Sequence, residues 1–218
     1  MSTNKNCIVV LSGGLDSATV AYWAKAHGYQ IHPITFNYGQ IAVKETEAAQ
    51  KIAQTLGTTT KIIDLSNLKE IFSTTTSLVN RNIPLTSEFS SPINVPFRNA
   101  IFLSTAVAYA ISISVNHIVY GAQNNDETFY PDCRPEFYKT FEKAARLGTD
   151  QQITIKAPYS KTKKDKLIQK GTTFGVPFEL TWSCYLDNEH HCGLCEACVN
   201  RKKAFQEANI TDPTRYQQ

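Results

Sequence analysis

The sequence predicts an α/β fold, a doubly wound and mostly parallel sheet, followed by a C-terminal metal-binding segment. Three observations predict it. Short apolar runs alternate with amphipathic stretches along the chain, as in parallel sheets with helices on both faces. A glycine-rich turn joins the first apolar run to the first helix, as at the ligand-binding edge of such sheets. Four cysteines crowd into the C-terminal part.

The individual elements follow from local patterns. Apolar runs predict buried strands, apolar residues at helical spacing predict helices, and Gly28 and Gly57 mark helix ends. The expected strands cover residues 7–10, 31–36, 61–65, 117–122 and 153–157, and the expected helices cover 18–27, 42–56, 100–115, 135–147 and 161–171. Residues 67–96 show no clean period and are rich in Ser, Thr and Pro, so we expect a partly ordered flap over the site.

Composition limits the classes of partner. The 22 Lys and Arg residues against 19 Asp and Glu leave a net charge of +3, too small by itself to indicate a nucleic-acid partner. Residues 4–6 lead straight into a strand, so no signal peptide is expected. The apolar stretch 100–115 is too short and too polar to span a membrane. We therefore expect no direct nucleic-acid partner and no membrane partner.

The turn after the first strand, residues 11–17, predicts a phosphate cradle. Gly13 and Gly14 can adopt positive φ and let the main chain approach a ligand. The N–H groups and dipole of the following helix favour an anion, and Ser12 and Ser17 add hydroxyl groups. No Lys follows the glycines, so this is not a GxxxxGK[ST] loop. A tight turn without a ligand is the alternative.

Polar side chains also follow other strands at the same sheet edge. Tyr38 follows the second strand and either stacks on a base or closes the crevice, or is an exposed loop aromatic. Arg98 begins the long helix, where an anion is favoured, or is an exposed residue near an ordinary cap.

The loop after the fourth strand offers Asp126, Asp132 and Arg134 as candidates to bind a polar heterocycle. Alternatively, Asp132 caps a helix with Arg134 as its partner. Cys133 is expected to be a buried thiol. Lysines crowd residues 161–166; such a run is usually solvated, but one of them could reach a phosphate.

The cysteines at 184, 192, 195 and 198 are spaced as metal ligands. CxxC turns place two thiolates on one ion, and four thiolates give Zn²⁺ a closed tetrahedral shell, which indicates a structural site. His190 or His191 could replace one cysteine, and an iron–sulfur cluster could use similar ligands. The clustering favours a metal over disulfides, and the expected compartment is therefore a reducing cytoplasm.

Several motifs occur in an order that resembles one family: SGGLDS, ITFNYGQ, VPFRN, YPDCRPEF, TWSCY with CGLCEAC, and a final DPTRY. The chain resembles the 7-cyano-7-deazaguanine synthases, ligases of queuosine precursor synthesis within the PP-loop ATP pyrophosphatases. It departs from the family pattern at Ile41–Ala42, Thr128–Phe129 and 164–166. These departures concern details of substrate contact and not the reaction class.

The resemblance implies a fold, a reaction and a set of residues. The fold is Rossmann-like, one domain over 1–218, with a nucleotide-binding core over 1–175 and a zinc-binding segment over 176–218. The reaction converts 7-carboxy-7-deazaguanine, ammonia and ATP into the nitrile, with Mg²⁺ accompanying ATP, one structural Zn²⁺ per chain, and a homodimeric assembly. The residues implied to bind ATP are Leu11, Ser12, Gly13, Gly14, Leu15, Asp16, Ser17, Ala18, Thr19, Val20 and Ala21. Those expected to take part in catalysis are Asp16, Ser17, Arg98 and Lys164, and those expected to contact the deazaguanine are Tyr130, Asp132 and Arg134. The residues implied to bind zinc are Cys184, Cys192, Cys195 and Cys198.

The chemistry of a nitrile suggests two successive adenylations. Adenylation of the carboxylate allows ammonia to attack and gives an amide, and the amide oxygen must be activated in turn before it can leave. No segment is left for a glutaminase, so ammonia is expected to come from solution. The alternative function is a PP-loop enzyme that thiolates tRNA directly, which would need an RNA-binding domain or a strongly basic face. A zinc-ribbon interaction module would not need the phosphate loop.

Overall fold

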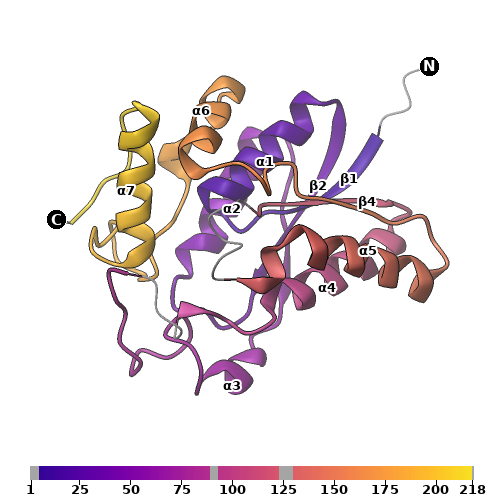
Figure 1. The fold of residues 1–218 in the computed structure, drawn as a ribbon, viewed down its shortest axis with the longest axis horizontal. Coiled ribbons are helices and arrows are strands. Elements are labelled where there is room, and N and C mark those ends of the chain that lie inside the picture. Colours follow the sequence, from indigo (N-terminus) through magenta and orange to yellow (C-terminus); the bar gives the residue numbers. More distant parts are fainter. Residues whose placement is uncertain (1–4, 89–92, 123–129, 218) are drawn as a thin grey trace.

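The structure is a computed structural model that describes residues 5–88, 93–122 and 130–217 (Figure 1). Its centre is a five-stranded sheet in the order β3-β2-β1-β4-β5, and every pairing is parallel. The strands are β1 Lys5–Val10, β2 Tyr29–Asn37, β3 Lys61–Asp64, β4 His117–Tyr120 and β5 Thr154–Lys156. The α-helices are α1 Leu15–Ala26, α2 Lys44–Thr55, α3 Leu68–Phe72, α4 Arg98–Ser112, α5 Pro135–Thr149, α6 Lys164–Phe174 and α7 Glu196–Ala208. This arrangement confirms the predicted fold class.

The strand order reverses beside β1. The chain adds β2 and β3 on one side of β1 and then returns to add β4 and β5 on the other side. Ile8 of β1 lies opposite Ile118 of β4, and the two strands end together at Val10 and Tyr120. In open parallel sheets the ligand crevice lies outside the carboxyl ends of the strands at such a reversal. The fold therefore places the crevice where the glycine-rich turn leaves β1.

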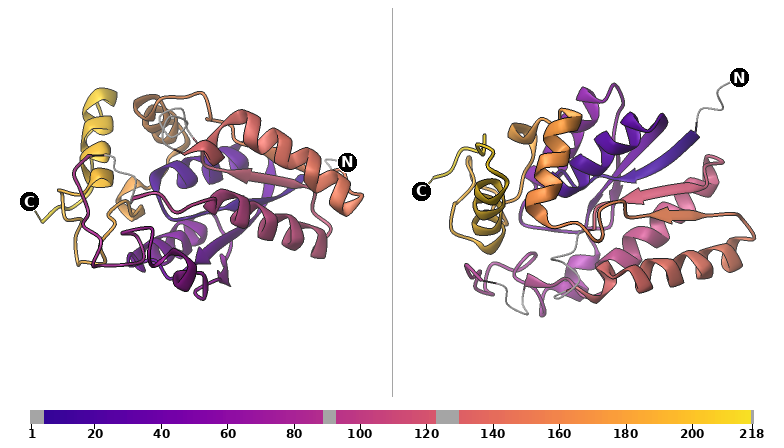
Figure 2. Two further views of the ribbon diagram at one scale, coloured as in Figure 1. Left: turned by 60° about the horizontal axis from the view of Figure 1, so that its bottom comes forward. Right: turned by 45° about the horizontal axis from the view of Figure 1, so that its top comes forward.

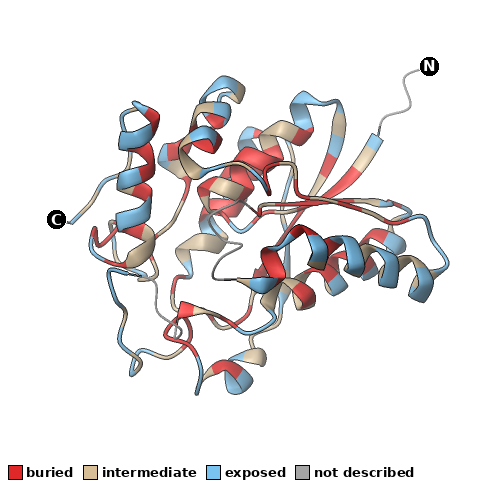
Figure 3. Cartoon of the chain, in the orientation of Figure 1, coloured by how far each residue is buried: buried red, intermediate tan, exposed pale blue. Residues whose placement is uncertain are grey.

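Helices cover both faces of the sheet (Figure 2). α1, α2 and α6 pack on one face around Val9 and Leu11, whereas α4 and α5 pack on the other around Ile8 and Ile34. β1 is buried on both faces, as expected for the central strand of a parallel sheet, and the inner faces of the helices are likewise buried (Figure 3). α7 adds Phe205 to the first of these cores through its packing on α6.

Some element boundaries differ from the sequence-based expectation. α1 begins at Leu15 and not at residue 18, because the main chain becomes helical directly after Gly14. α6 begins at Lys164 because Lys163 is extended (φ −69°, ψ 155°). α4 includes Arg98 and ends at Ser112, so the predicted placement of Arg98 at a helix N-terminus is confirmed. The rest of the expected strands and helices occur close to their expected positions.

The sequence analysis missed α7, which starts directly after Cys195. Its buried residues Cys198, Arg201, Ala204, Phe205 and Ala208 follow helical spacing. An arginine and one of the four clustered cysteines stand in this stripe, so the apolar period is not visible in the sequence. The sequence pattern therefore does not predict this helix, because its buried face includes polar residues.

The segment expected to form a flap has an apolar cluster of its own. Phe72 of the short helix α3, Leu78, Val79 and Val95 pack with Tyr38. Part of this segment, residues 89–92, lies outside the described residues. In the described ranges, no helix is long and apolar enough to cross a membrane.

Candidate functional site

The glycines of the turn after β1 are required by close packing. Gly13 has φ +89°, and a Cβ atom built on it would lie 2.1 Å from the carbonyl oxygen of Glu45 at the start of α2. A Cβ atom on Gly121, directly after β4, would lie 2.9 Å from the nitrogen of Ser17. Because both contacts are with main chain, neither can be relieved by moving a side chain. The lack of a side chain at these two glycines thus allows the ends of β1 and β4 and the start of α2 to pack closely against one loop.

Hydroxyl groups hold the shape of this phosphate loop, residues 11–17. Ser17 is 5% exposed, and its Oγ accepts from the Ser12 N–H at 3.1 Å and donates to the Gly14 carbonyl at 3.0 Å. Since the Ser17 proton is used by Gly14, the Ser12 hydroxyl is the donor in its 3.0 Å contact with Ser17 Oγ. The hydroxyl of Ser17 is therefore engaged within the loop.

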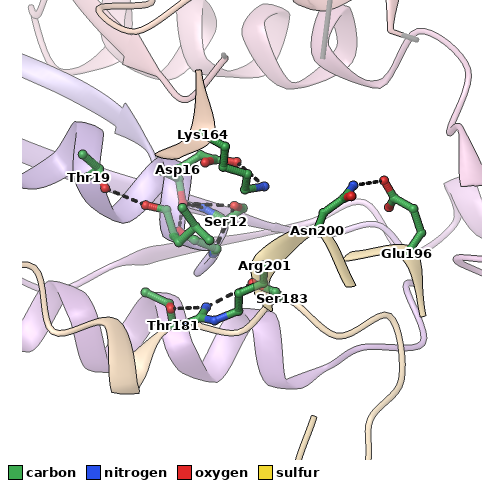
Figure 4. A network of polar contacts seen from close by, with 12 residues as sticks. Ser12, Asp16, Thr19, Lys164, Thr181, Ser183, Glu196, Asn200 and Arg201 are labelled. Carbon is green, nitrogen blue, oxygen red and sulfur yellow. Dashed lines mark hydrogen bonds and ion pairs between the residues drawn. The ribbon is translucent and has the colours of Figure 1, made fainter. Parts of the chain in front are cut away.

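Asp16 and Lys164 come together from two helices. Lys164 Nζ at the start of α6 lies 3.3 Å from Asp16 Oδ2 in the first turn of α1 (Figure 4). The other oxygen, Asp16 Oδ1, is buried and has no hydrogen-bond partner among the described residues. A buried carboxylate oxygen without a partner is costly unless a cation or donor completes it. The oxygen is thus suited to a divalent cation that accompanies a polyphosphate.

A cavity of about 220 Å³ opens beside this pair. It lies at the strand-order reversal, between the ends of β1 and β4. Its lining includes eight residues singled out from the sequence: Ser12, Gly14, Asp16, Ser17, Arg98, Tyr130, Asp132 and Lys164. The fold thus brings together side chains from four separate segments. The rest of the mainly polar wall is formed by Asn94, Val95, Asn99, Gly121, Cys133 and Tyr185. Sequence reasoning did not single out Asn94, Gly121 or Tyr185 as site residues.

The other predicted nucleotide-binding residues lie behind the loop. Leu11, Leu15, Ala18, Val20 and Ala21 are buried in the core, because Leu11 directly follows β1 and the other four lie in α1 against the sheet. Thr19 is also fully buried, and its hydroxyl donates to the Leu15 carbonyl at 2.8 Å. Only their main chain could meet a ligand.

Asp132 connects the loop before α5 to the start of α4. It lies in the short 3₁₀ helix η3, Pro131–Cys133, and its Oδ2 accepts from the Asn99 N–H at 2.9 Å. Asn99 Nδ2 in turn donates to Cys133 Sγ at 3.2 Å. Asp132 therefore caps a helix, but the helix is α4 and not α5.

The remaining sequence candidates of this loop differ in where they lie. Cys133 is buried, as predicted. Arg134 is exposed and is not among the described residues that line the 220 Å³ cavity. Asp126 lies outside the described residues.

A second cavity of about 150 Å³ adjoins the first and shares Ser12, Ser17, Arg98, Asn99 and Gly121 with it. Tyr38 forms its wall and is only 4% exposed, so it is not an exposed loop aromatic. The Arg98 guanidinium donates to the Tyr38 hydroxyl at 3.1 Å.

Glu45, which the sequence analysis did not single out, lines the same second cavity. Burial raises the pKa of the Glu45 carboxyl to about 7, although nearby Arg98 opposes the shift. Its position in the first turn of α2, just after the Tyr38–Gln40 loop, was the available sequence signal. A carboxyl group that titrates near neutral pH thus faces this cavity.

The four cysteines form a separate centre. Their sulfur atoms lie within 4.8 Å of one another, and all four residues are buried. Cys192 and Cys198 Sγ are 3.9 Å apart, and Cys184 and Cys195 Sγ are 4.0 Å apart. Zn–S bonds of about 2.3 Å in a tetrahedron place sulfur atoms about 3.8 Å apart. The geometry therefore fits a four-coordinate metal ion.

Hydrogen bonds favour a thiolate at Cys184. Cys184 Sγ accepts from the main-chain N–H of Leu186 and of Cys192, each at 3.4 Å. Hydrogen bonds from the Cys195 and Cys198 thiols, followed by those from the main chain, lower the pKa of Cys184 to about 4.

The neighbouring histidines are not part of the sulfur cluster. His191 Nε2 accepts from the Ser183 N–H at 3.0 Å, and burial lowers the pKa of His191 to about 4. His190 lines a separate surface cleft. The described residues therefore give a four-cysteine centre and not one with three cysteines and a histidine.

The parallel sheet, the loop after β1 and the crevice at the strand reversal define a PP-loop-type α/β protein. Solved structures share this fold at low sequence identity. A 4-thiouridine synthetase in complex with RNA and bound ATP aligns with a TM-score of 0.59 and 17% identity over 94% of this chain and 50% of that one. NMN synthetase from Francisella tularensis aligns with a TM-score of 0.54 and 15% identity over 95% and 85% of the two chains.

The chain belongs to the family described as queuosine biosynthesis protein QueC, whose model matches residues 6–209. Among its relatives, the 7-cyano-7-deazaguanine synthase of Thermoplasma acidophilum is 40% identical over 98% of this chain and 92% of its own length. The protein of the same name from Pseudoalteromonas atlantica is 38% identical over 96% and 98%. The suspected family is confirmed, and tRNA thiolation is not favoured.

Proposed function

We propose that the protein converts 7-carboxy-7-deazaguanine, ammonia and ATP into 7-cyano-7-deazaguanine. The observation that carries the proposal is the single cavity in which the phosphate loop, the Asp16–Lys164 pair and the Tyr130–Asp132 segment meet. The family assignment supplies the substrate class, since the relatives are named for this product.

In this proposal the polyphosphate of ATP lies at the phosphate loop. The first turn of α1 offers main-chain N–H donors at its positive end. Lys164 and Arg98 line the cavity and would neutralise charge on the transferring phosphoryl group. Asp16 would hold Mg²⁺ through its buried oxygen, and the ion would supply charge neutralisation at the phosphates. Ser17 acts mainly by keeping the loop in shape.

The reaction would proceed through two adenylations in the same cavity. A carboxylate oxygen attacks the α-phosphorus of ATP and releases pyrophosphate, and ammonia then displaces AMP to give the amide. The amide oxygen attacks the α-phosphorus of a second ATP, which releases pyrophosphate, and the loss of AMP and of both amide N–H protons leaves the nitrile. The two oxygens of the acid leave as part of the two AMP molecules, so the equation balances.

The heterocycle would be held by the loop before α5. Tyr130 and Asp132 line the cavity near the phosphate loop and are suited to a substrate rich in ring N–H groups. Arg134 remains a proposed contact on the grounds of the family motif alone, since it is exposed and is not among the described residues that line the cavity.

The metal of the cysteine centre is proposed to be a structural Zn²⁺, one per chain. A closed shell of four thiolates leaves no position for water, which argues against a hydrolytic role. Elemental analysis of purified protein tests the assignment: one zinc per chain is expected, and iron with visible colour would indicate an iron–sulfur cluster instead.

Three further features belong to the proposal. The protein works in the cytoplasm, supported by the lack of disulfide bonds among the described cysteines. It assembles as a homodimer, as the family resemblance implies. It forms one domain in which residues 1–175 bind the nucleotide and 176–218 bind the metal, supported by the packing of α7 on α6.

The function is tested by mass spectrometry of a reaction that contains ATP, ammonium and 7-carboxy-7-deazaguanine. We expect the nitrile, AMP and pyrophosphate, and none of them in an otherwise identical reaction without the acid. A matched incubation with unmodified tRNA and a sulfur donor addresses the alternative. Thiolated tRNA with no nitrile would overturn the proposal.

A further inference from the structure

A strap from the C-terminal segment, residues 178–184, meets the phosphate loop. The Trp182 N–H donates to the Gly13 carbonyl at 2.9 Å. A Cβ atom on Gly14 would lie 3.7 Å from the Trp182 carbonyl oxygen, so the strap also runs beside the next residue of the loop. The strap therefore joins the metal-binding segment to the main chain of the phosphate loop.

Arg201 on α7 holds the strap from behind. Its side chain is fully buried, and its Nη1 donates to Thr181 Oγ1 at 2.7 Å and to Ser183 Oγ at 3.1 Å (Figure 4). Its Nη2 donates to the Phe178 carbonyl at 2.9 Å. Thr181 and Ser183 flank the residue that is bonded to the loop. One guanidinium thus fixes the strap on both sides of Trp182.

The charge of Arg201 is compensated by Asp212. Arg201 Nε lies 3.2 Å from Asp212 Oδ1, and the Tyr216 hydroxyl donates to Asp212 Oδ2 at 2.6 Å. A buried ion pair adds little net stability, because desolvation offsets the attraction. Its value here lies in geometry: a planar guanidinium reaches several acceptors in fixed directions, which the single nitrogen of lysine cannot do.

The metal side of the strap is equally constrained. The ring of His191 lies over that of Trp182 with centroids 4.2 Å apart, and Trp182 Nε1 donates to the carbonyl of the metal-site residue Cys184 at 2.8 Å. Trp182 is therefore fixed by its ring as well as by its neighbours. Its main-chain N–H has little freedom to leave Gly13.

We propose that Arg201 is a positioning residue for ATP: through the strap it holds the phosphate loop in the shape that accepts the polyphosphate. The inference rests on the proposed function, which places ATP at this loop. Arg201 is not among the described residues that line the two cavities, so its influence passes through the Trp182–Gly13 bond. It is not a contact with substrate.

The test is the affinity for a nonhydrolysable ATP analogue, measured by calorimetry on folded, zinc-loaded protein. Arg201→Lys keeps the charge beside Asp212 but loses the fork, and Arg201→Met removes both. We expect both to weaken binding about tenfold or more, with zinc content unchanged and the KM for the deazaguanine acid within about twofold. Arg146→Met is the matched control, because Arg146 also binds a carbonyl (Ile153, 2.6 Å) and a carboxylate (Glu142, 2.7 Å), but on α5. It should leave the affinity unchanged.

Fluorescence gives a second readout, since the chain has two tryptophans. In a Trp23→Phe background, the analogue should change Trp182 emission, and Arg201→Lys should abolish the change at matched concentration. Should both Arg201 variants fail to fold, Thr181→Val combined with Ser183→Ala removes two acceptors while keeping the arginine. The same loss of affinity is expected of it.

Several results would overturn the inference. Normal affinity in folded, zinc-loaded Arg201→Lys would do so, as would an equal loss in Arg146→Met or a loss of affinity that occurs only with loss of zinc. If the unaltered protein does not bind the analogue, the proposed function fails as well. If it binds and the variants bind equally, only the role of Arg201 is lost.

Discussion

Replacing Gly13 by alanine tests the close packing at the phosphate loop. The residue has φ +89°, and the added Cβ atom would lie 2.1 Å from the Glu45 carbonyl oxygen and 2.9 Å from the Ala49 nitrogen. Gly57→Ala is the matched control, because Gly57 has φ +76° and a Cβ atom there would meet nothing within 4 Å. The control therefore measures the backbone strain without the collision.

The two variants should differ by the cost of the collision. The left-handed conformation costs a non-glycine residue about 1–2 kcal/mol, and forcing extra atoms into a packed site adds about 1–3 kcal/mol. We expect Gly57→Ala to destabilise by about 1–2 kcal/mol and Gly13→Ala by about 2–5 kcal/mol. For a chain of this size, each kcal/mol lowers Tm by roughly 2–4 °C. Since α2 must shift from the loop, Gly13→Ala should also lose ATP turnover.

The assay combines thermal melting with calorimetric titration of the ATP analogue. Gly57→Ala should melt lower but bind the analogue like the unaltered protein. The reasoning is refuted if Gly13→Ala and Gly57→Ala lose the same stability and Gly13→Ala keeps its affinity and turnover.

Three more variants probe the charge, the metal and the titrating group. Asp16→Asn should fold normally by circular dichroism yet lose about 10²–10³ in kcat, because the variant removes the carboxylate that pairs with Lys164 and that is proposed to bind Mg²⁺. Near-normal turnover would argue against the assignment. Cys195→Ser should lose zinc by elemental analysis and melt lower, because structural zinc contributes folding free energy; full zinc content would contradict the four-cysteine centre. Burial raises the pKa of Glu45 from 4.5 to about 7, so the neutral form is favoured in the folded protein. The folding stability that Glu45 contributes is therefore fully present below about pH 4.5 and is lost as the pH rises through 7. The Tm of the unaltered protein relative to Glu45→Gln should fall across that window, and a constant difference from pH 4.5 to 8 would show that Glu45 does not titrate there.

Local patterns predicted most of the fold. The buried strands and the helix-terminating glycines have signals in adjacent residues, and the SGGLDS turn lies where it was expected, between β1 and α1. The four-cysteine spacing also predicted the cluster of sulfur atoms that could hold a metal ion, since its residues are close in sequence. These features depend on short-range geometry, which a sequence displays directly.

Contacts between distant segments were not visible. Asp132 caps α4 from a position beyond β4, so the helix that it caps could not be chosen from sequence. Glu45 became a cavity residue only because Gly13 brings α2 against the phosphate loop. The sequence did not predict α7, because a buried arginine in its stripe cannot be told from a solvated one without knowledge of its partners in the strap. In each case the information lies in tertiary packing.

The most direct test of the central claim starts from the proposed intermediate. The protein is given 7-amido-7-deazaguanine that carries heavy oxygen in its amide, together with ATP and no ammonia. Attack of the amide oxygen on the α-phosphorus predicts the nitrile, pyrophosphate, and AMP that contains the heavy oxygen, as read by mass spectrometry. An inert amide, unlabelled AMP, or ADP and phosphate in place of AMP would contradict the double adenylation.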